Sequence, residues 1–152
     1  MLELETFRSR LAERGYRSTP QRVAIYRLLA HDKSHPTAED VHRRLLRSFP
    51  TVSLATVYNT LELFVELGLA VPLGFEGERR HYDGNPQAHV NLRCRRCGRI
   101  QDLDESGLEA IARRVAERSG FELIGQRHEF YGLCPECRST ASAHSEANPA
   151  PA

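Results

Sequence analysis

Two Cys-x-x-Cys pairs constrain the fold of this 152-residue chain more than any other feature of its sequence. Cys94 and Cys97 form the first pair, Cys134 and Cys137 form the second, and residues 98–133 separate them. Each pair offers two thiolates from one tight turn, and two such pairs make the tetrahedral four-sulfur site that Zn(II) prefers. The intervening length accommodates a strand, a helix and a returning strand, so both pairs can meet at one edge of a small unit.

Two other interpretations of the cysteines are a redox dithiol switch and four unrelated buried thiols. The N-terminus MLELETFRSRLAER lacks an apolar secretory core, so we expect a cytoplasmic protein, where disulfides are rare. The longest apolar runs are interrupted by Glu66, Gly68 and Pro72, and none is long enough to span a membrane. We therefore predict a structural Zn(II) ion that stabilises a unit too small to rely on its own core.

The sequence carries no recognisable catalytic arrangement. A zinc deaminase would need His-x-Glu together with Pro-Cys-x-x-Cys, but His128 and Glu129 are adjacent and Pro135 lies inside the second cysteine pair. Neither a Ser/His/Asp nucleophile arrangement nor a Gly-rich phosphate loop is evident. We expect a protein that is not an enzyme.

The N-terminal half has the pattern of several short helices followed by a hairpin. Apolar periodicity and capping residues predict helices over 3–14, from Thr19-Pro20, from a Thr37–Asp40 capping box, and from Ser53 to Gly68. Two β-like runs, 69–75 and 79–83, are joined by 76–78. This order is typical of a winged helix-turn-helix, in which the last helix enters the DNA major groove.

Polar and basic side chains fit a DNA-binding role for this half. The helix after Ser53 is expected to expose Thr56, Tyr58, Asn59 and Thr60, whose groups suit phosphates and base edges. Six arginines (8, 10, 14, 17, 22 and 27) and one acid, Glu13, lie between residues 8 and 27, although the net charge of the chain is only +1. The alternative for both features is an ordinary solvated surface.

The C-terminal half is predicted to be a separate α+β unit. Strands are expected over 88–93, 99–103 and 121–133, with a helix over 106–119 that turns Leu108, Ile111, Ala112 and Val115 inward. The expected organisation is a DNA-binding domain over 1–83, a hinge over 84–87, a second domain over 88–138 and a disordered tail over 139–152.

Several of these motifs, in this order, resemble the Fur family of metal-responsive repressors. The motifs are Gly15–Arg22 (GYRSTPQR), His35–Asp40 (HPTAED), Ser53–Tyr58 (SLATVY), His89 with Cys94-x-x-Cys97-Gly98, and Tyr131-Gly132-x-Cys134-x-x-Cys137. The resemblance covers about residues 3–138. It implies a homodimer with an N-terminal winged-helix domain that binds double-stranded operator DNA and a C-terminal dimerisation domain that holds structural zinc. It also implies that a second, regulatory metal closes the dimer onto DNA. Together with the helix pattern, it assigns the DNA contacts to Arg17, Arg22, Ser53, Thr56, Tyr58 and Asn59.

The resemblance also assigns a regulatory metal site, with ligands from both predicted domains. Its ligands fall on His35, Asp83, His89, Asn91 and Asp102. Each has an alternative reading, as a loop histidine, a turn acid or an edge-strand charge. The family pattern has a second histidine where this chain has Asn91, which offers only a neutral carbonyl oxygen. Two histidines and two carboxylates still suit Fe(II) or Mn(II).

Aspartate at both acid positions, 83 and 102, is more similar to the peroxide-sensing branch of the family than to its iron-uptake branch. In that branch Fe(II) reacts with peroxide, and the oxidised histidines here would be His35 and His89. The alternatives are an iron, manganese or zinc uptake regulator without oxidation chemistry, and a thiol-redox protein that does not bind DNA. A further family metal site is poorly supported, because its ligand positions hold Ala88, Val90 and Gln126.

Overall fold

The computed structural model describes residues 4–74, 79–85, 87–123 and 126–139. These residues divide into two compact units, one ending at Ala88 and the other beginning at His89, and each is described by itself. Among them, no helix has both the length and the apolar character needed to cross a bilayer.

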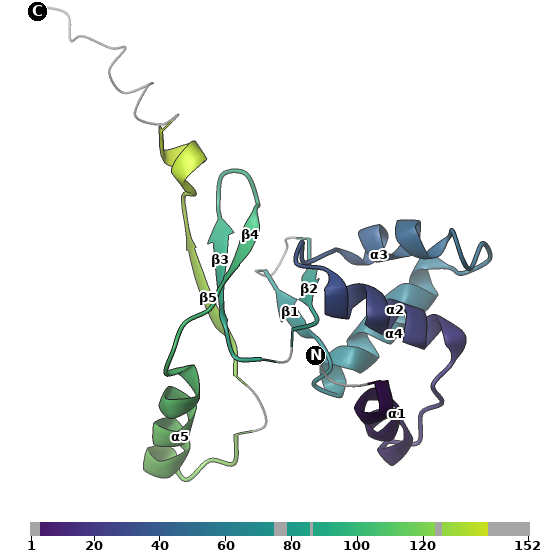
Figure 1. Ribbon diagram of the computed structural model, residues 1–152, viewed down its shortest axis with the longest axis horizontal. Coiled ribbons are helices and arrows are strands. Elements are labelled where there is room, and N and C mark those ends of the chain that lie inside the picture. Colours follow the sequence, from purple (N-terminus) through teal and green to yellow (C-terminus); the bar gives the residue numbers. More distant parts are fainter. Residues whose placement is uncertain (1–3, 75–78, 86, 124–125, 140–152) are drawn as a thin grey trace, which may run out of the picture. The chain divides into compact units, whose positions relative to one another are not determined.

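The described part of the N-terminal unit contains four helices and a two-stranded ribbon (Figure 1). In chain order the elements are α1 (Leu4–Glu13), α2 (Pro20–His31), α3 (Ala38–Leu45), α4 (Leu54–Glu66), β1 (Val71–Leu73) and β2 (His81–Asp83). This order confirms the predicted winged helix-turn-helix plan. The predicted loop 76–78 lies outside the described residues.

Side-chain caps begin three of these helices where the sequence predicts. Thr19 accepts a hydrogen bond from the Arg22 amide ahead of Pro20, and Ser53 accepts one from the Thr56 amide. Thr37 and Asp40 form the complete capping box, since each side chain accepts from the other residue's backbone N–H at 3.2 Å. The caps satisfy amides that the first turn of a helix leaves without intrahelical partners.

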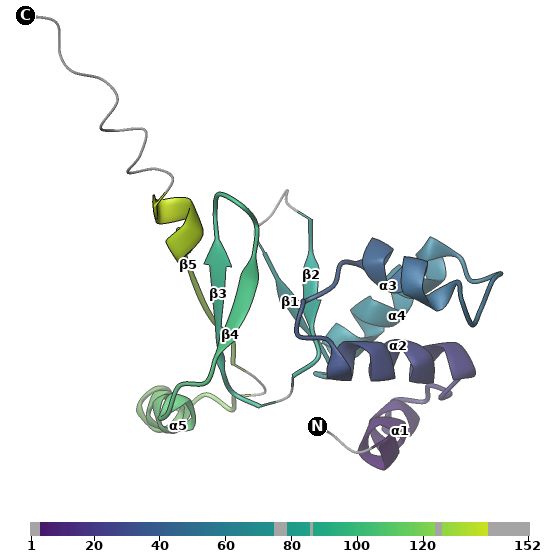
Figure 2. The same ribbon diagram turned by 45° about the horizontal axis from the view of Figure 1, so that its top comes forward.

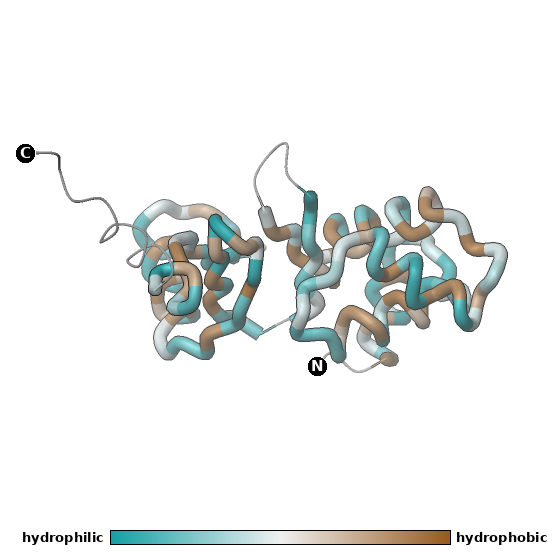
Figure 3. The backbone as a smooth tube through the Cα atoms, turned by 90° about the horizontal axis from the view of Figure 1, so that it is seen from above, coloured by the Kyte–Doolittle hydropathy of each residue, from teal (hydrophilic) through white to brown (hydrophobic). Residues whose placement is uncertain are grey.

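An aromatic cluster joins α1, α2 and α4 into one core. Phe7 stacks on Tyr26 with ring centroids 4.2 Å apart and meets Phe64 edge-on at 5.4 Å. Apolar segments of the helices in this unit alternate with polar ones along the chain (Figure 3).

Gly84 passes so close to α2 that a Cβ there would lie 2.8 Å from the Cβ of Leu29, so this position requires glycine.

The β1–β2 ribbon is held against the helices by polar as well as apolar contacts. The strands are antiparallel, with Val71 opposite Asp83 and Leu73 opposite His81. Tyr82 is buried, and its hydroxyl donates to Glu62 of α4 at 3.0 Å. Burial, together with this hydrogen bond to a carboxylate, raises the pKa of Tyr82 to about 12.

In its described residues, the C-terminal unit contains a three-stranded sheet, one helix between the second and third strands in chain order, and a short helical segment over 135–139 (Figure 2). Its elements are β3 (Val90–Cys94), β4 (Ile100–Leu103), α5 (Leu108–Ser119) and β5 (His128–Gly132). The strand order is β4-β3-β5, with β4 antiparallel and β5 parallel to the central strand. The α+β fold class is thus confirmed, but the described part of the predicted strand 121–133 forms a strand only over β5.

Three predicted side-chain orientations are wrong. Thr60 is buried, and its hydroxyl donates to the Thr56 carbonyl at 2.8 Å, so it needs no water as a partner. Ile111 and Val115 are 42% and 48% exposed, since α5 buries only Leu108 among its residues.

The capping box makes a prediction about stability. Thr37→Ala removes the acceptor for the Asp40 amide and should lower the free energy of unfolding of the N-terminal unit by about 1 kcal/mol. Urea unfolding of the full chain, followed by the helical circular dichroism signal, measures this loss. Thr51→Ala, at an exposed turn, is the matched control, and equal midpoints for the two variants would contradict the assignment.

Candidate metal centres

The four cysteines converge in the C-terminal unit. One sulfur atom from each of Cys94, Cys97, Cys134 and Cys137 lies within 4.8 Å of the others, and the Sγ atoms of Cys97 and Cys134 are 3.8 Å apart. The sheet causes this convergence, because parallel pairing places Cys94, the last residue of β3, opposite Gly132, the last residue of β5. The four-cysteine cluster that the spacing predicts is therefore present.

The first pair lies on a tight turn, and charged side chains join the two pairs. The Gly98 amide donates to the Cys94 carbonyl at 2.9 Å, with Gly98 at φ 74°. Arg99 makes two hydrogen bonds to the Glu136 carboxylate, at 2.9 and 2.6 Å, and Arg96 donates to the Cys137 carbonyl at 2.8 Å. Arg96 lies between the cysteines of the first pair, and Arg99 lies two residues after it. Their partners, Cys137 and Glu136, belong to the turn of the second pair, so these bonds link the two turns.

The sulfur atoms have unequal proton affinities. The backbone N–H groups of Cys134 and Cys97 lower the pKa of Cys94 to about 6, whereas hydrogen bonding to the Cys134 sulfur and burial raise the pKa of Cys137 to about 12. The neighbouring sulfur atom and burial therefore oppose the formation of a thiolate at Cys137. A bound divalent cation removes this opposition, and a thiolate tetrad is the ligand set of structural zinc.

In the N-terminal unit, His35 and Asp83 lie together. A ring nitrogen of His35 and a carboxylate oxygen of Asp83 are within 4.8 Å of each other, and both residues are buried. Asp83 ends β2 and accepts a hydrogen bond from the Asn85 amide at 2.8 Å. Burial of a histidine next to a carboxylate excludes the simple reading of His35 as an exposed loop residue.

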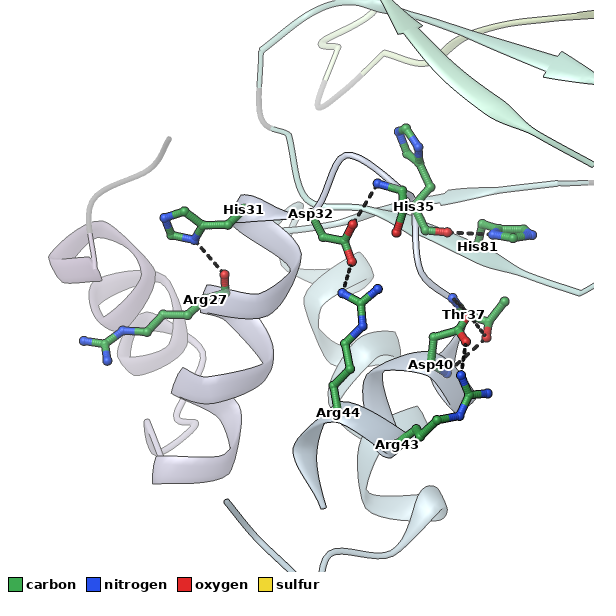
Figure 4. A network of polar contacts seen from close by, with 10 residues as sticks. Arg27, His31, Asp32, His35, Thr37, Asp40, Arg43, Arg44 and His81 are labelled. Carbon is green, nitrogen blue, oxygen red and sulfur yellow. Dashed lines mark hydrogen bonds and ion pairs between the residues drawn. The ribbon is translucent and has the colours of Figure 1, made fainter. Parts of the chain in front are cut away.

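The backbone of His35 is strained. Its φ of 51° places it in the left-handed region, and it precedes a proline, which disfavours helical backbone conformations. His81 of β2 donates from Nδ1 to the His35 carbonyl at 2.6 Å (Figure 4). The Tyr82 amide donates to the Pro36 carbonyl at 3.0 Å. These bonds hold the loop on the edge of β2, and such strain is typical of functional positions.

The same loop is fastened at its other end by Asp32 (Figure 4). Asp32 follows α2, accepts from the Ser34 amide at 2.8 Å and forms an ion pair with Arg44 of α3. Burial disfavours the Asp32 carboxylate, but the hydrogen bonds from Ser34 and Arg44 outweigh it and lower its pKa. Asp32, Arg44 and His81 are positioning residues that the sequence analysis did not identify, because no local pattern links residues so far apart.

In the C-terminal unit, β3 and β4 bring together the other three predicted ligands. Asn91 lies opposite Asp102 in the strand register, and His89 lies two residues before Asn91 on the same side of the chain. His89 Nε2 is 3.2 Å from Asn91 Nδ2 and 3.7 Å from Asp102 Oδ1. His89 and Asn91 are both buried.

These residues fit a cation. Among the described residues, the amide oxygen of Asn91 is a buried atom without a hydrogen-bond partner. A buried acceptor without a donor is costly, and a metal ion would satisfy it. An imidazole, an amide oxygen and a carboxylate are ligand types that Fe(II) and Mn(II) accept.

The predicted DNA-contact residues lie in the N-terminal unit, and all of them except Arg22 are exposed. Ser53 and Thr56 hydrogen-bond to each other at 2.9 Å, and Tyr58 donates to Glu39 of α3 at 3.0 Å. Arg22, which is half-buried, donates to the Arg17 carbonyl at 2.7 Å, and its guanidinium lies 5.5 Å from the Tyr16 ring centroid. Their role in binding DNA stays a prediction.

Comparison with known proteins gives one consistent result. The sequence model of the ferric uptake regulator family matches residues 13–131. The peroxide-responsive repressor PerR of Staphylococcus aureus (strain USA300) is 36% identical over 136 residues, which cover 90% of this chain and 92% of that protein.

Solved structures agree with this assignment. The peroxide stress regulator of Campylobacter jejuni superposes with a TM-score of 0.69 at 25% identity, over 90% of this chain and 100% of that one. The iron-containing ferric uptake regulator of Francisella tularensis gives a TM-score of 0.62 at 30% identity, over 82% of this chain and 96% of that one. The chain therefore belongs to the ferric uptake regulator family of metal-dependent transcription regulators, which are not enzymes.

Proposed function

We propose that this protein is a dimeric, metal-dependent repressor that releases its operator DNA when peroxide oxidises its regulatory site. The observation that carries the proposal is the donor set: two buried histidines and two aspartates, in a chain 36% identical to a peroxide-responsive repressor. Regulators of this family bind operator DNA as dimers.

The four-cysteine cluster is the proposed structural zinc site. Its sulfur atoms already lie within 4.8 Å of one another, so Zn(II) binding requires little rearrangement. Among its described residues, the C-terminal unit has few buried apolar side chains of its own, namely Val90, Cys94 and Leu108. A structural metal is a common source of stability for a unit of this kind.

The proposed DNA-reading element is α4. Its N-terminal turn exposes Ser53 and Thr56, and Tyr58 and Asn59 follow on the exposed side. Hydroxyl groups and helix N-terminal amides suit phosphates, and an asparagine side chain suits adenine edges. Arg17 and Arg22 lie just before and within α2 and add positive charge for the DNA backbone.

A second copy of this chain is the proposed partner of the C-terminal unit. Leu92 of β3 and Phe130 of β5 are register partners on one sheet face, and Phe130 is 62% exposed. Ile111 and Val115 add a further apolar stripe on α5. Exposed apolar side chains in this number are typical of a protein interface, and dimerisation would bury the residues predicted to face inward.

The proposed regulatory metal is bound by His35 and Asp83 of the N-terminal unit and by His89, Asn91 and Asp102 of the C-terminal unit. Ligands from two units give the metal a differential affinity for one relative orientation of those units. Metal binding then shifts the population toward that orientation, and DNA binding shifts metal affinity by the same factor.

Peroxide is the proposed signal. Fe(II) in this site would transfer one electron to hydrogen peroxide and split it into hydroxide and a hydroxyl radical. The radical would add to an imidazole carbon of His35 or His89, and the adduct would return one electron to Fe(III) and lose one proton, which leaves one added oxygen atom on the ring. An oxidised imidazole is a poorer ligand, so the site loses affinity and the DNA-binding orientation loses its stabilisation.

An uptake regulator is the second candidate function. It is supported by the 30% identity to an iron-containing ferric uptake regulator structure and by a donor set that needs no oxidation to respond to metal. A thiol-redox function is less well supported, because the four cysteines form one compact cluster suited to a single metal. Oxidation chemistry distinguishes the two metal-sensing candidates.

The zinc site is tested by Cys94→Ser. Loss of one thiolate should release the bound zinc and unfold the C-terminal unit, because the remaining three sulfur atoms cannot complete a closed tetrahedral site. Elemental analysis and amide NMR of the purified full chain measure both effects. A folded, zinc-free variant dimer would show that the cluster is not structural.

The regulatory site is tested by His89→Ala, with His128→Ala as the matched control. His89→Ala should abolish Mn(II)-stimulated operator binding and leave zinc content unchanged, since it removes a regulatory ligand and no cysteine. Operator affinity is measured by fluorescence anisotropy with and without Mn(II). The assignment fails if His89→Ala and His128→Ala respond to Mn(II) in the same way.

Peroxide sensing is tested by mass spectrometry. Peroxide treatment of the Fe(II)-loaded protein should add one oxygen atom to peptides containing His35 or His89, whereas the Mn(II)-loaded protein should remain unmodified. Oxidation of cysteines alone would support the thiol-redox function. An unmodified Fe(II) protein that still releases DNA on metal removal would support the uptake regulator.

A further inference from the structure

The side-chain amide of Asn91 is surrounded by acceptors. β3 is the central strand of the sheet, so Asn91 has Asp102 opposite it on β4 and Glu129 opposite it on β5. Side chains in register on neighbouring strands lie on the same face of a sheet. The third neighbour, His89, faces the amide nitrogen through Nε2 at 3.2 Å.

This environment satisfies the amide nitrogen but not the amide oxygen. Nδ2 donates to His89 Nε2, which must then be an unprotonated acceptor. Among the described residues, Oδ1 of Asn91 and Oε1 of Glu129 are both buried and without a hydrogen-bond partner. Two unsatisfied acceptors therefore occupy register partners on one sheet face, and the Glu129 side chain is only 9% exposed.

The nearby arginines do not resolve the conflict. Arg127 lies 3.8 Å from the other carboxylate oxygen of Glu129, Oε2. Arg93 lies two residues beyond Asn91 on β3, on the same face, and donates no hydrogen bond to the Asn91 oxygen. A cation near His89, together with a rotation of the Asn91 amide, would satisfy both oxygens. The cation would bind Oδ1 of Asn91, and Nδ2 of the rotated amide would donate to Oε1 of Glu129.

We propose that Asn91 is a ligand of the regulatory metal through Oδ1 and that Glu129 is the positioning residue that holds it in this orientation. This inference rests on the proposed regulatory site and adds Glu129 to it. When a metal binds, the amide turns by half a rotation, which frees the Nε2 lone pair of His89 and directs Oδ1 toward the ion. Nδ2 then donates to Oε1 of Glu129.

This arrangement determines metal choice. With the metal bound, the amide contributes a hard, neutral oxygen, and the hydrogen bond from Nδ2 to a carboxylate makes that oxygen a better donor. Without metal, the same amide competes for the lone pair of His89. Both effects favour ions that accept oxygen ligands, such as Mn(II) and Fe(II), over ions that rely on imidazole nitrogen, such as Zn(II), Ni(II) and Cu(II).

The first test is Glu129→Gln in the full-length, zinc-loaded protein, with Glu117→Gln on the exposed side of α5 as the control for charge. A glutamine at position 129 can donate to the Asn91 oxygen and so stabilise the metal-free orientation. Glu129→Gln should therefore weaken Mn(II) binding about tenfold or more, the usual effect of losing a residue that orients a ligand. Electron paramagnetic resonance of free Mn(II) measures the affinity, and Glu117→Gln should leave it unchanged.

The second test repeats Glu129→Gln in an Asn91→Asp background. Aspartate keeps the oxygen ligand but has no N–H for Glu129, and two facing carboxylates repel each other. Glu129→Gln should now leave Mn(II) affinity unchanged or raise it. A tenfold loss in both backgrounds would show that Glu129 is merely structural and would overturn the proposal, as would equal affinities for Glu129→Gln and Glu117→Gln.

His35→Ala separates this inference from the proposed function. If His35→Ala abolishes Mn(II) binding and Glu129→Gln does not affect it, the regulatory site stands and the role of Glu129 is wrong. A different result upholds the Asn91–Glu129 pair. In that result Glu129→Gln weakens Mn(II) binding, this loss disappears or changes sign in the Asn91→Asp background, and His35→Ala has no effect on Mn(II) binding. In that case the proposed five-residue ligand set is wrong.

Discussion

The convergence of four sulfur atoms is the interaction on which the C-terminal unit depends. In the described part of this unit the sheet has three short strands and α5 buries a single leucine, so apolar burial contributes little within one chain. The parallel pairing of β3 with β5 brings the two cysteine pairs to one end of the sheet. A cation that neutralises the thiolates then stabilises this pairing, and the pairing is also what places Asn91 beside Glu129.

The N-terminal unit is built on the opposite principle. Phe7, Tyr26 and Phe64 form an aromatic core with no need of metal, and three capped helices pack around it. This stability allows one loop to hold His35 in a strained backbone conformation, fastened by Asp32 on one side and His81 on the other. Because this unit is rigid, the position of His35 within it is fixed. A metal that also binds ligands of the other unit would therefore favour one relative orientation of the two units, as proposed above.

Asn91 stands where the family pattern has a histidine, and this difference changes how the proposed site would bind a metal. An imidazole at this position would bind a metal directly, whereas the amide must first give up its hydrogen bond to His89. In the proposed site, metal binding is thereby coupled to a local rearrangement on the sheet, with Glu129 as the partner that makes the rearrangement favourable. Selectivity then depends on the cost of turning one amide, as well as on the number of ligands.

Local patterns in the amino-acid sequence specify the elements that depend on local chemistry. Caps at Thr19, Thr37 and Ser53 mark helix starts because their acceptors lie within three residues, and the spacing of the cysteines determines that they can form one cluster. Which polar atoms meet across strands, in contrast, follows from the pairing of the strands in the folded chain. The register that pairs Asn91 with Glu129, and the exposure of Ile111 and Val115, follow from contacts between residues far apart in the chain. Strand pairing and packing between distant segments, which no local pattern encodes, bring these residues together or leave them exposed.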